Sequence, residues 1–171
     1  MKAARLVTPV LVPLLLISCS GGRKAVPQPD VDAYEAGDDV TGTMVLVASS
    51  DSDFKIEVAR RIGESLNDKP VHVRFIGLEQ LAGEDISRYS AIIVMDRCVT
   101  WGLDIATESF LKKNTGLTSM VVLFTSGDGE WNPDMEGRKY DAVTSASILS
   151  NADSVADEIL GKVYAILEAE S

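Results

Sequence analysis

Three uninterrupted apolar runs constrain the fold of this 171-residue chain more than any other feature. They read MVLVAS from Met44, AIIVM from Ala91 and SMVVLFTS from Ser119. Runs without alternation are typical of strands buried on both faces, as in parallel sheets covered by helices. Segments with helical spacing of apolar residues lie between the runs, and this alternation predicts an α/β fold.

Two further strands and three helices complete the predicted fold. VHVRFIGL from Val71 alternates like a half-exposed strand, and YDAVTSAS from Tyr140 gives a weaker strand signal. Helical patterns start near Phe54, near Leu103 and after Asn151. We therefore predict a three-layer α/β/α sandwich around a five-stranded parallel sheet with the strand order 2-1-3-4-5.

A sheet of this order binds ligands beyond the carboxyl ends of its strands, at the point where the strand order reverses. That edge receives three predicted loops, at 49–54, 96–101 and 126–131. Trp101 and Trp131 fall on two of these loops. Aromatic side chains at a ligand edge favour a ligand with a flat ring.

The first 18 residues have the pattern of a secretion signal. Lys2 and Arg5 precede an apolar run at 6–17 that is too short to span a membrane comfortably. The sequence LISC, which ends at Cys19, resembles the bacterial lipobox. This resemblance implies cleavage before Cys19 and acylation of that cysteine with diacylglycerol and an N-acyl chain such as palmitate. An ordinary signal peptide followed by a chance cysteine is the alternative.

The lipobox resemblance implies a lipoprotein of the bacterial cell envelope, anchored in the outer membrane or in the outer leaflet of the inner membrane. Residues 19–42 are rich in Gly, Pro and Asp and are predicted to be a flexible tether, and residues 43–171 are predicted to be the folded domain. Val31 and Tyr34 could dock on the domain, although nothing in the sequence requires it.

Charge and cysteine content limit the partners further. Removal of Lys2 and Arg5 with the signal takes the formal net charge from −10 to −12. An acidic protein of this kind has no electrostatic footprint for nucleic acid or for anionic lipid head groups, so the lipid itself is the predicted membrane contact. With Cys19 acylated, Cys98 is the one remaining cysteine, and no intrachain disulfide is expected.

The second predicted loop resembles flavodoxins. In YSAIIVMDRCVTWGLDIATESFL a strand ends, a Cys-x-Thr-Trp-Gly loop follows and a helix begins, with Asp104 also on the pattern. VVLFTSGDGEW resembles the next flavin-contacting loop, and the resemblance extends over 43–169. It implies a flavodoxin-like fold that binds FMN with the isoalloxazine ring stacked on the loop tryptophan. The implied FMN contacts are Ser49, Ser50, Ser52, Cys98, Thr100, Trp101, Gly102, Ser126, Gly127 and Trp131.

The first loop departs from the flavodoxin pattern. Flavodoxins carry roughly S/T-x-T-G-x-T there, and its hydroxyl and N–H groups hold the FMN phosphate at a helix N-terminus. This chain has SSDSDF, in which glycine is absent and Phe54 replaces a hydroxyl. Asp51 and Asp53 would oppose a dianion by about 1 kcal/mol or more at ~4 Å. Asp53 is interpreted as the N-cap of the following helix.

Two functions follow from these observations, and neither requires a catalytic residue. The first is a membrane-anchored module that binds FMN, or a related flat ring, and transfers electrons to a redox partner. The second is a degenerate flavodoxin-like domain without a cofactor, which acts as an interaction or scaffold protein of the envelope. The altered phosphate loop favours the second function, and the tryptophan loop favours the first.

Two other resemblances are fainter. VASSDSDF, IIVMD and VVLFTSGD resemble strands of response-regulator receivers, with Asp96 as phospho-acceptor and Thr125 as switch hydroxyl. However, the acid pair that binds Mg²⁺ in receivers falls on Ser49 and Ser50, and no lysine ends the last strand. DAVTSAS faintly resembles a motif for covalent FMN attachment with Ser147 at the acceptor position, and we interpret it as a strand.

Metal and nucleophile chemistry receive little support. DGEWNPDME echoes a calcium loop, but Pro133 stands where glycine is needed, so an acidic surface loop is the interpretation. His72, the single histidine, is interpreted as an exposed strand residue without metal partners. Cys98 has no base close in sequence and is not expected to act as a nucleophile. No metal site is predicted.

Overall fold

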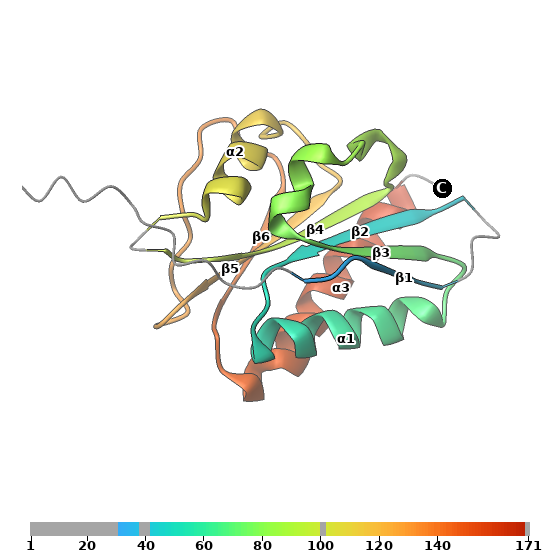
Figure 1. Ribbon diagram of the computed structural model, residues 1–171, viewed down its shortest axis with the longest axis horizontal. Helices are drawn as coiled ribbons and strands as arrows, with labels where there is room; N and C mark the ends of the chain where they lie inside the picture. The colour runs from blue at the N-terminus through green and yellow to red at the C-terminus, as the bar shows by residue number, and fades with distance from the viewer. Residues whose placement is uncertain (1–30, 38–41, 100–101, 170–171) are drawn as a thin grey trace, which may run out of the picture.

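The computed structural model describes residues 31–37, 42–99 and 102–169, which form one α/β unit (Figure 1). The strands are β1 (Tyr34–Ala36), β2 (Met44–Ser49), β3 (His72–Gly77), β4 (Ala91–Arg97), β5 (Met120–Ser126) and β6 (Asp141–Ala146). The α-helices are α1 (Asp53–Asn67), α2 (Ile105–Lys113) and α3 (Ala152–Ala169). Short 3-10 helices are η1 (Leu78–Gly83), η2 (Ile86–Arg88) and η3 (Leu149–Asn151). The predicted signal 1–18 and Cys19 lie outside the described residues.

The sheet has six strands in the order β1-β3-β2-β4-β5-β6, so the predicted strand count and order were wrong. The prediction of a purely parallel sheet was also wrong, because β1 pairs with β3 in the antiparallel sense. The remaining neighbours are parallel, and their order runs β3-β2-β4-β5-β6. The α/β class and the three layers are therefore as predicted, and the added edge strand accounts for the difference.

β1 comes from the segment predicted to be a tether. Tyr34 pairs with Phe75, and Ala36 pairs with Val73. Since β3 runs from His72 toward Gly77, this antiparallel register puts the start of β1 at the carboxyl edge of the parallel strands. The chain therefore enters the fold at the same edge that carries the predicted ligand loops.

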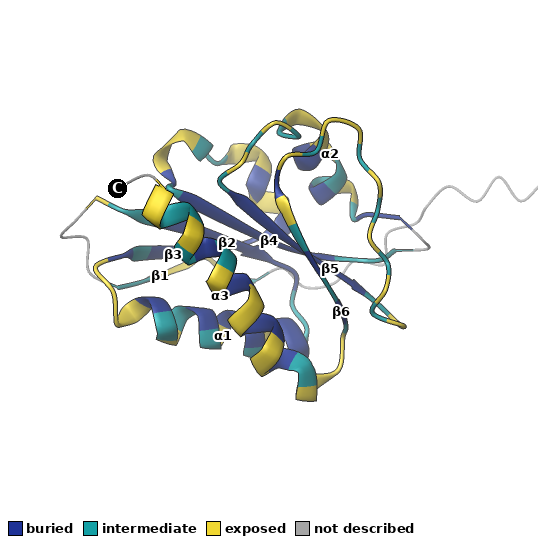
Figure 2. Cartoon of the chain, turned by 180° about the vertical axis from the view of Figure 1, so that it is seen from behind, coloured by how far each residue is buried: buried dark blue, intermediate teal, exposed yellow. Residues whose placement is uncertain are grey.

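Two apolar cores hold the three layers together. One core lies between the sheet and the pair α1 and α3, and the other lies between the sheet and α2 with η1 (Figure 2). The two faces of β4 show why its sequence does not alternate. Ile93 and Met95 belong to the first core, and Ile92 and Val94 belong to the second. The residues of β4 that lie between the two cores are therefore apolar without alternation.

Side-chain caps set the starts of the two helices beside the ligand loops. Ser52 is extended and its Oγ accepts a hydrogen bond from the Lys55 amide at 3.3 Å. Asp53 is the first residue of α1, so its interpretation as the N-cap was wrong by one position. Asp104 caps α2 by accepting from the Ala106 amide at 3.0 Å. In the ranges that the structure describes, no helix is both long and apolar enough to cross a membrane.

We expect Ser52→Ala to lower the free energy of unfolding by about 1 kcal/mol, because the substitution removes the one side-chain acceptor at the start of α1. Ser150→Ala is the control, since Ser150 is exposed and caps no α-helix. Urea unfolding of both variants measures the difference. Equal stability of the two variants would show that the cap contributes nothing.

Candidate functional site

The carboxyl edge of the sheet brings the three predicted loops together, as β2, β4 and β5 are adjacent and parallel. In the first loop, each predicted serine is engaged within the chain. The Ser49 hydroxyl donates to the Ser50 carbonyl at 2.9 Å, and Ser52 caps α1. The Ser50 hydroxyl accepts from the Lys55 ammonium at 2.8 Å. The hydroxyl groups of this turn therefore make their hydrogen bonds within the turn and the first turn of α1.

Lys55 is a site residue that the sequence analysis missed. Its side chain is among the largest fully buried ones, with 2% of the residue exposed. Burial lowers the pKa of Lys55 to about 8, and the opposing attraction of Asp96 raises it. One sequence signal could have identified it, since Lys55 shares the helix face of Ala59, Ile62 and Leu66 at spacings of three and four residues.

Asp96 is the next-to-last residue of β4, is fully buried and interacts electrostatically with Lys55. Burial raises the pKa of Asp96 to about 7, while the nearby Thr107 hydroxyl and the Lys55 charge lower it. Its Oδ1 accepts from the Asp104 amide at 3.3 Å, and its backbone carbonyl accepts from the Thr125 hydroxyl at 2.9 Å. The other carboxylate oxygen and the Thr107 hydroxyl are buried without hydrogen-bond geometry to any protein group.

Lys55 and Asp96 therefore form a buried charge pair directly beneath the predicted ligand edge. Asp96 is fully buried and Lys55 is 2% exposed, and Lys55 also borders a cavity beside Tyr34 and Phe75. The pair is a structural support of this edge, because each charge compensates the other inside a medium of low polarity.

The pH dependence of stability should reveal the Asp96 carboxyl. Burial raises its pKa from 3.8 to about 7, so between these values the folded chain keeps a proton that the unfolded chain loses. The protonated Asp96 carboxyl contributes its whole stabilisation below the pKa of the unfolded chain, 3.8. That contribution is lost as the pH rises through the folded-state pKa of about 7. Relative to Asp96→Asn, the unmodified chain is expected to lose about 2 kcal/mol of unfolding free energy between about pH 5 and about pH 8.

Urea unfolding of both chains at the two pH values measures that difference. Lys55 acts in the opposite direction, because its pKa is lowered from 10.5 to about 8 and its contribution is lost as the pH falls. Most of that loss lies above the pH range used. Parallel pH profiles of the two chains would contradict a raised pKa for Asp96.

The second loop contains the residues of the flavodoxin resemblance. Val99 and Gly102 form an isolated antiparallel bridge, with hydrogen bonds of 2.7 and 3.0 Å. Gly102 is buried, and Cys98 is a half-buried free thiol whose amide donates to the Thr125 carbonyl. The predicted contacts Thr100 and Trp101 lie outside the described residues.

The third loop is closed around one hydroxyl. The Ser126 Oγ donates to Asp128 at 2.6 Å and accepts from the amides of Gly129 and Trp131 at 3.0 and 3.4 Å. Trp131 is half-buried against the second core and contacts Phe124 edge-on, with ring centroids 5.8 Å apart. Gly127 is exposed in open space. The indole of Trp131 thus packs on the protein's own core.

The FMN site implied by the flavodoxin resemblance does not fit the residues of the first loop. The serine hydroxyls make hydrogen bonds within the loop, and Ser52 already serves the amide of Lys55. The Ser52 carbonyl also accepts from the Ile56 amide at 2.8 Å. Asp51 and Asp53 place two carboxylates at the turn where a phosphate dianion would bind.

The remaining candidates from the sequence lie apart from this edge. His72 begins β3 at the opposite end of the sheet, where it is half-buried and contacts Glu35 at 3.3 Å, so its interpretation as exposed was wrong. Within the described ranges, no group of three metal-ligating side chains is assembled. DAVTSA forms β6, which confirms its interpretation as a strand.

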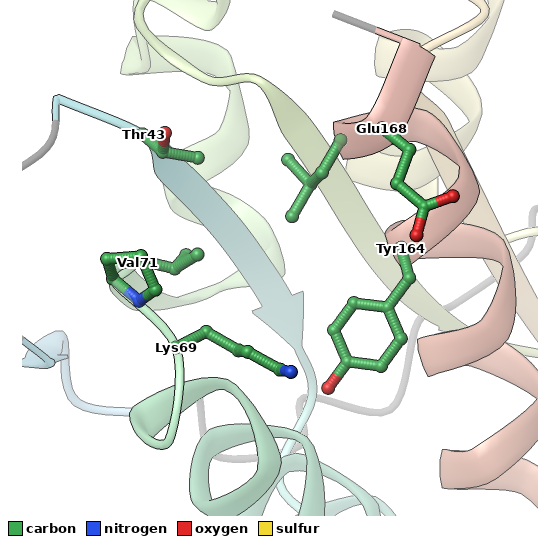
Figure 3. Close-up of a pocket in the computed structure, with 7 residues that line it drawn as sticks. Thr43, Lys69, Val71, Tyr164 and Glu168 are labelled. Atoms are coloured by element: carbon green, nitrogen blue, oxygen red, sulfur yellow. The ribbon is translucent and has the colours of Figure 1, made fainter. Parts of the chain in front are cut away.

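A separate hollow of about 360 Å³ lies at the amino end of the sheet (Figure 3). Lys69 and Tyr164 border it, with the ammonium 5.8 Å from the ring centroid. The Tyr164 hydroxyl shares a hydrogen bond of 2.8 Å with Ser65, which fixes α3 against α1. This hollow is at the far end of the strands from the predicted loops.

Comparison with known proteins adds no relative to these observations. The sequence matches no protein-family model, and a search of curated proteins found none with significant similarity.

Proposed function

We propose that this chain is a lipid-anchored envelope protein whose flavodoxin-like domain binds no flavin and acts as an interaction or scaffold module. The anchor is a lipid on Cys19, as the lipobox resemblance implies. The observation that carries the proposal is the closed first loop, in which Ser50, Ser52 and Lys55 satisfy one another.

The electrostatics of the ligand edge support this proposal. A phosphate dianion at the first loop would meet Asp51 and Asp53, and the Lys55 ammonium is buried and compensated by Asp96. The N-terminus of a helix attracts anions through its unpaired amides. Here the Ser52 hydroxyl engages one of these amides, that of Lys55 in the first turn of α1.

FMN binding remains the second candidate, because the bridge between Val99 and Gly102 joins the two described ends of the tryptophan loop at the ligand edge. In this alternative the domain carries electrons to a redox partner. The ring would be held chiefly by stacking, which does not require a phosphate site.

One titration separates the two functions. Residues 20–171 keep every described contact, and this chain is purified and titrated with FMN up to about 100 μM, a range in which a Kd near 1 μM (about −8 kcal/mol) would saturate. We expect a colourless protein with unquenched tryptophan fluorescence. Saturable quenching that Trp101→Ala abolishes would refute the cofactor-free function and support the flavin alternative.

A further inference from the structure

β1 is a very short strand held at the edge of β3. Its three residues pair with β3 at Tyr34–Phe75, Glu35–Arg74 and Ala36–Val73. A strand of this length adds few backbone hydrogen bonds, whereas the neighbouring strand β3 has six residues available for pairing. Within the described residues, three of the six residues of β3 therefore stay outside the pairing with β1 and could pair with a longer extended segment.

The side chains of β1 make specific contacts with β3. The Tyr34 ring stacks on Phe75, with centroids 4.4 Å apart and an angle of 7° between the rings. Glu35 pairs with Arg74 at 3.0 Å and with His72 at 3.3 Å. An aromatic residue followed by an acid is thus what this edge recognises.

The contact with β1 is also incompletely packed. A cavity of about 100 Å³ lies under the strand, and Val31, Tyr34 and Phe75 line it with Ile56 of α1. Tyr34 itself is 47% exposed, and Ile56 is 49% exposed. Side chains that line a void of this size lack van der Waals contacts that a better-fitting segment would make.

We propose that the edge of β3 is a binding groove for an extended aromatic–acidic segment of a partner protein, and that β1 occupies this groove as an intramolecular competitor. The inference rests on the proposed function as an interaction module and names its class of partner. Such strand addition uses backbone hydrogen bonds for affinity and side-chain contacts for specificity. The tethered β1 competes at a high effective concentration, so a partner gains access when β1 is released.

Two glycines provide a matched pair of release and control variants. Gly37 and Gly42 both have left-handed backbone, with φ of 89° and 73°. A Cβ at Gly37 would lie 2.3 Å from the Val71 carbonyl oxygen, whereas a Cβ at Gly42 would meet nothing within 4 Å. Both substitutions cause the same backbone strain, but Gly37→Ala alone pushes the end of β1 away from the sheet.

The test uses residues 20–171 and a fluorescein-labelled peptide with the sequence of residues 31–37, VDAYEAG. Fluorescence anisotropy is expected to show at least about tenfold tighter binding to Gly37→Ala than to the unmodified chain or Gly42→Ala. A peptide with lysine in place of Glu35 should lose that gain, because it would oppose Arg74. Equal binding to all three chains, or equal binding of both peptides, would overturn the groove.

Hydrogen exchange provides a second measurement on the unmodified chain, in case Gly37→Ala does not fold. Saturating VDAYEAG peptide should accelerate exchange of the amides of Tyr34–Ala36 and leave those of β4 unchanged. Unaltered exchange of Tyr34–Ala36 would overturn the proposal. A Gly37→Ala chain that dimerises and excludes the peptide would also overturn it, because a second copy of the chain would then occupy the edge of β3. FMN binding in the titration above would refute the proposed function and leave these peptide results unaffected.

Discussion

Asp96→Asn is expected to change the free energy of unfolding by less than about 1 kcal/mol at about pH 5 and to be more stable than the unmodified chain by about 2 kcal/mol at about pH 8, because the fold disfavours the ionised carboxylate and the amide has no charge to bury. Lys55 is 2% exposed and Asp96 is fully buried, so solvent screens neither group. Burial alone already lowers the pKa of Lys55, and Asp96 is the main group that opposes this effect. Urea unfolding at the two pH values measures both effects.

The double variant Lys55→Met/Asp96→Asn tests the physical reason. At about pH 8, Lys55→Met alone should lower the free energy of unfolding, because the Asp96 carboxylate then has no counter-charge, and the added Asp96→Asn change should recover that loss. Asp134→Asn is the surface control, since Asp134 is exposed, and its change should stay within about 0.5 kcal/mol. A double variant whose change in unfolding free energy equals the sum of the two single changes would show that the charges act independently.

Gly129→Ala is expected to lower the free energy of unfolding by about 2–4 kcal/mol, because backbone strain and a steric clash act together. Gly129 has φ of 78°, and a Cβ there would lie 2.5 Å from the amide nitrogen of Ala146. The Cβ would meet a backbone atom, so no neighbouring side chain can rotate away to relieve the clash. The third loop or the end of β6 would have to move.

Gly137→Ala is the matched control for Gly129→Ala. Its φ of 75° gives nearly the same strain, but the nearest atom to a Cβ is the Thr115 hydroxyl at 3.7 Å. We expect a loss of about 1 kcal/mol from strain alone. Thermal unfolding of both variants separates the two causes, and equal losses would show that the approach to Ala146 is unimportant.

The layers of the fold could be predicted because burial on two faces leaves a direct sequence signal. β2, β4 and β5 have apolar residues at nearly every position, as both cores require. β1 carries no such signal, since YEA is short and Tyr34 is half exposed. Its position depends on the Phe75 ring and on Arg74, which are about forty residues away in sequence. The strand count and order were therefore beyond prediction from pattern alone.

The candidate site could be located from sequence, but the use of its groups could not be predicted. Parallel strands bring their carboxyl ends to one edge, and this topology placed the three loops together. The same residue types that bind phosphate also close turns, and the choice depends on geometry. Ser52 and Ser126 each serve backbone amides of their own loops. Buried lysines are rare, so the residue type of Lys55 concealed the helix-face position that marks it as buried.

The antiparallel direction of β1 limits where this protein can act. Val31 lies at the carboxyl edge of the sheet, because β1 starts beside the end of β3. A lipid on Cys19 would be separated from Val31 by a stretch that reaches at most about 40 Å when fully extended. Withdrawal of β1 would lengthen this reach as far as the start of β2, by at most another ~40 Å. If Cys19 carries the proposed lipid, the maximum distance of the domain from the bilayer would therefore depend on whether β1 is paired with β3.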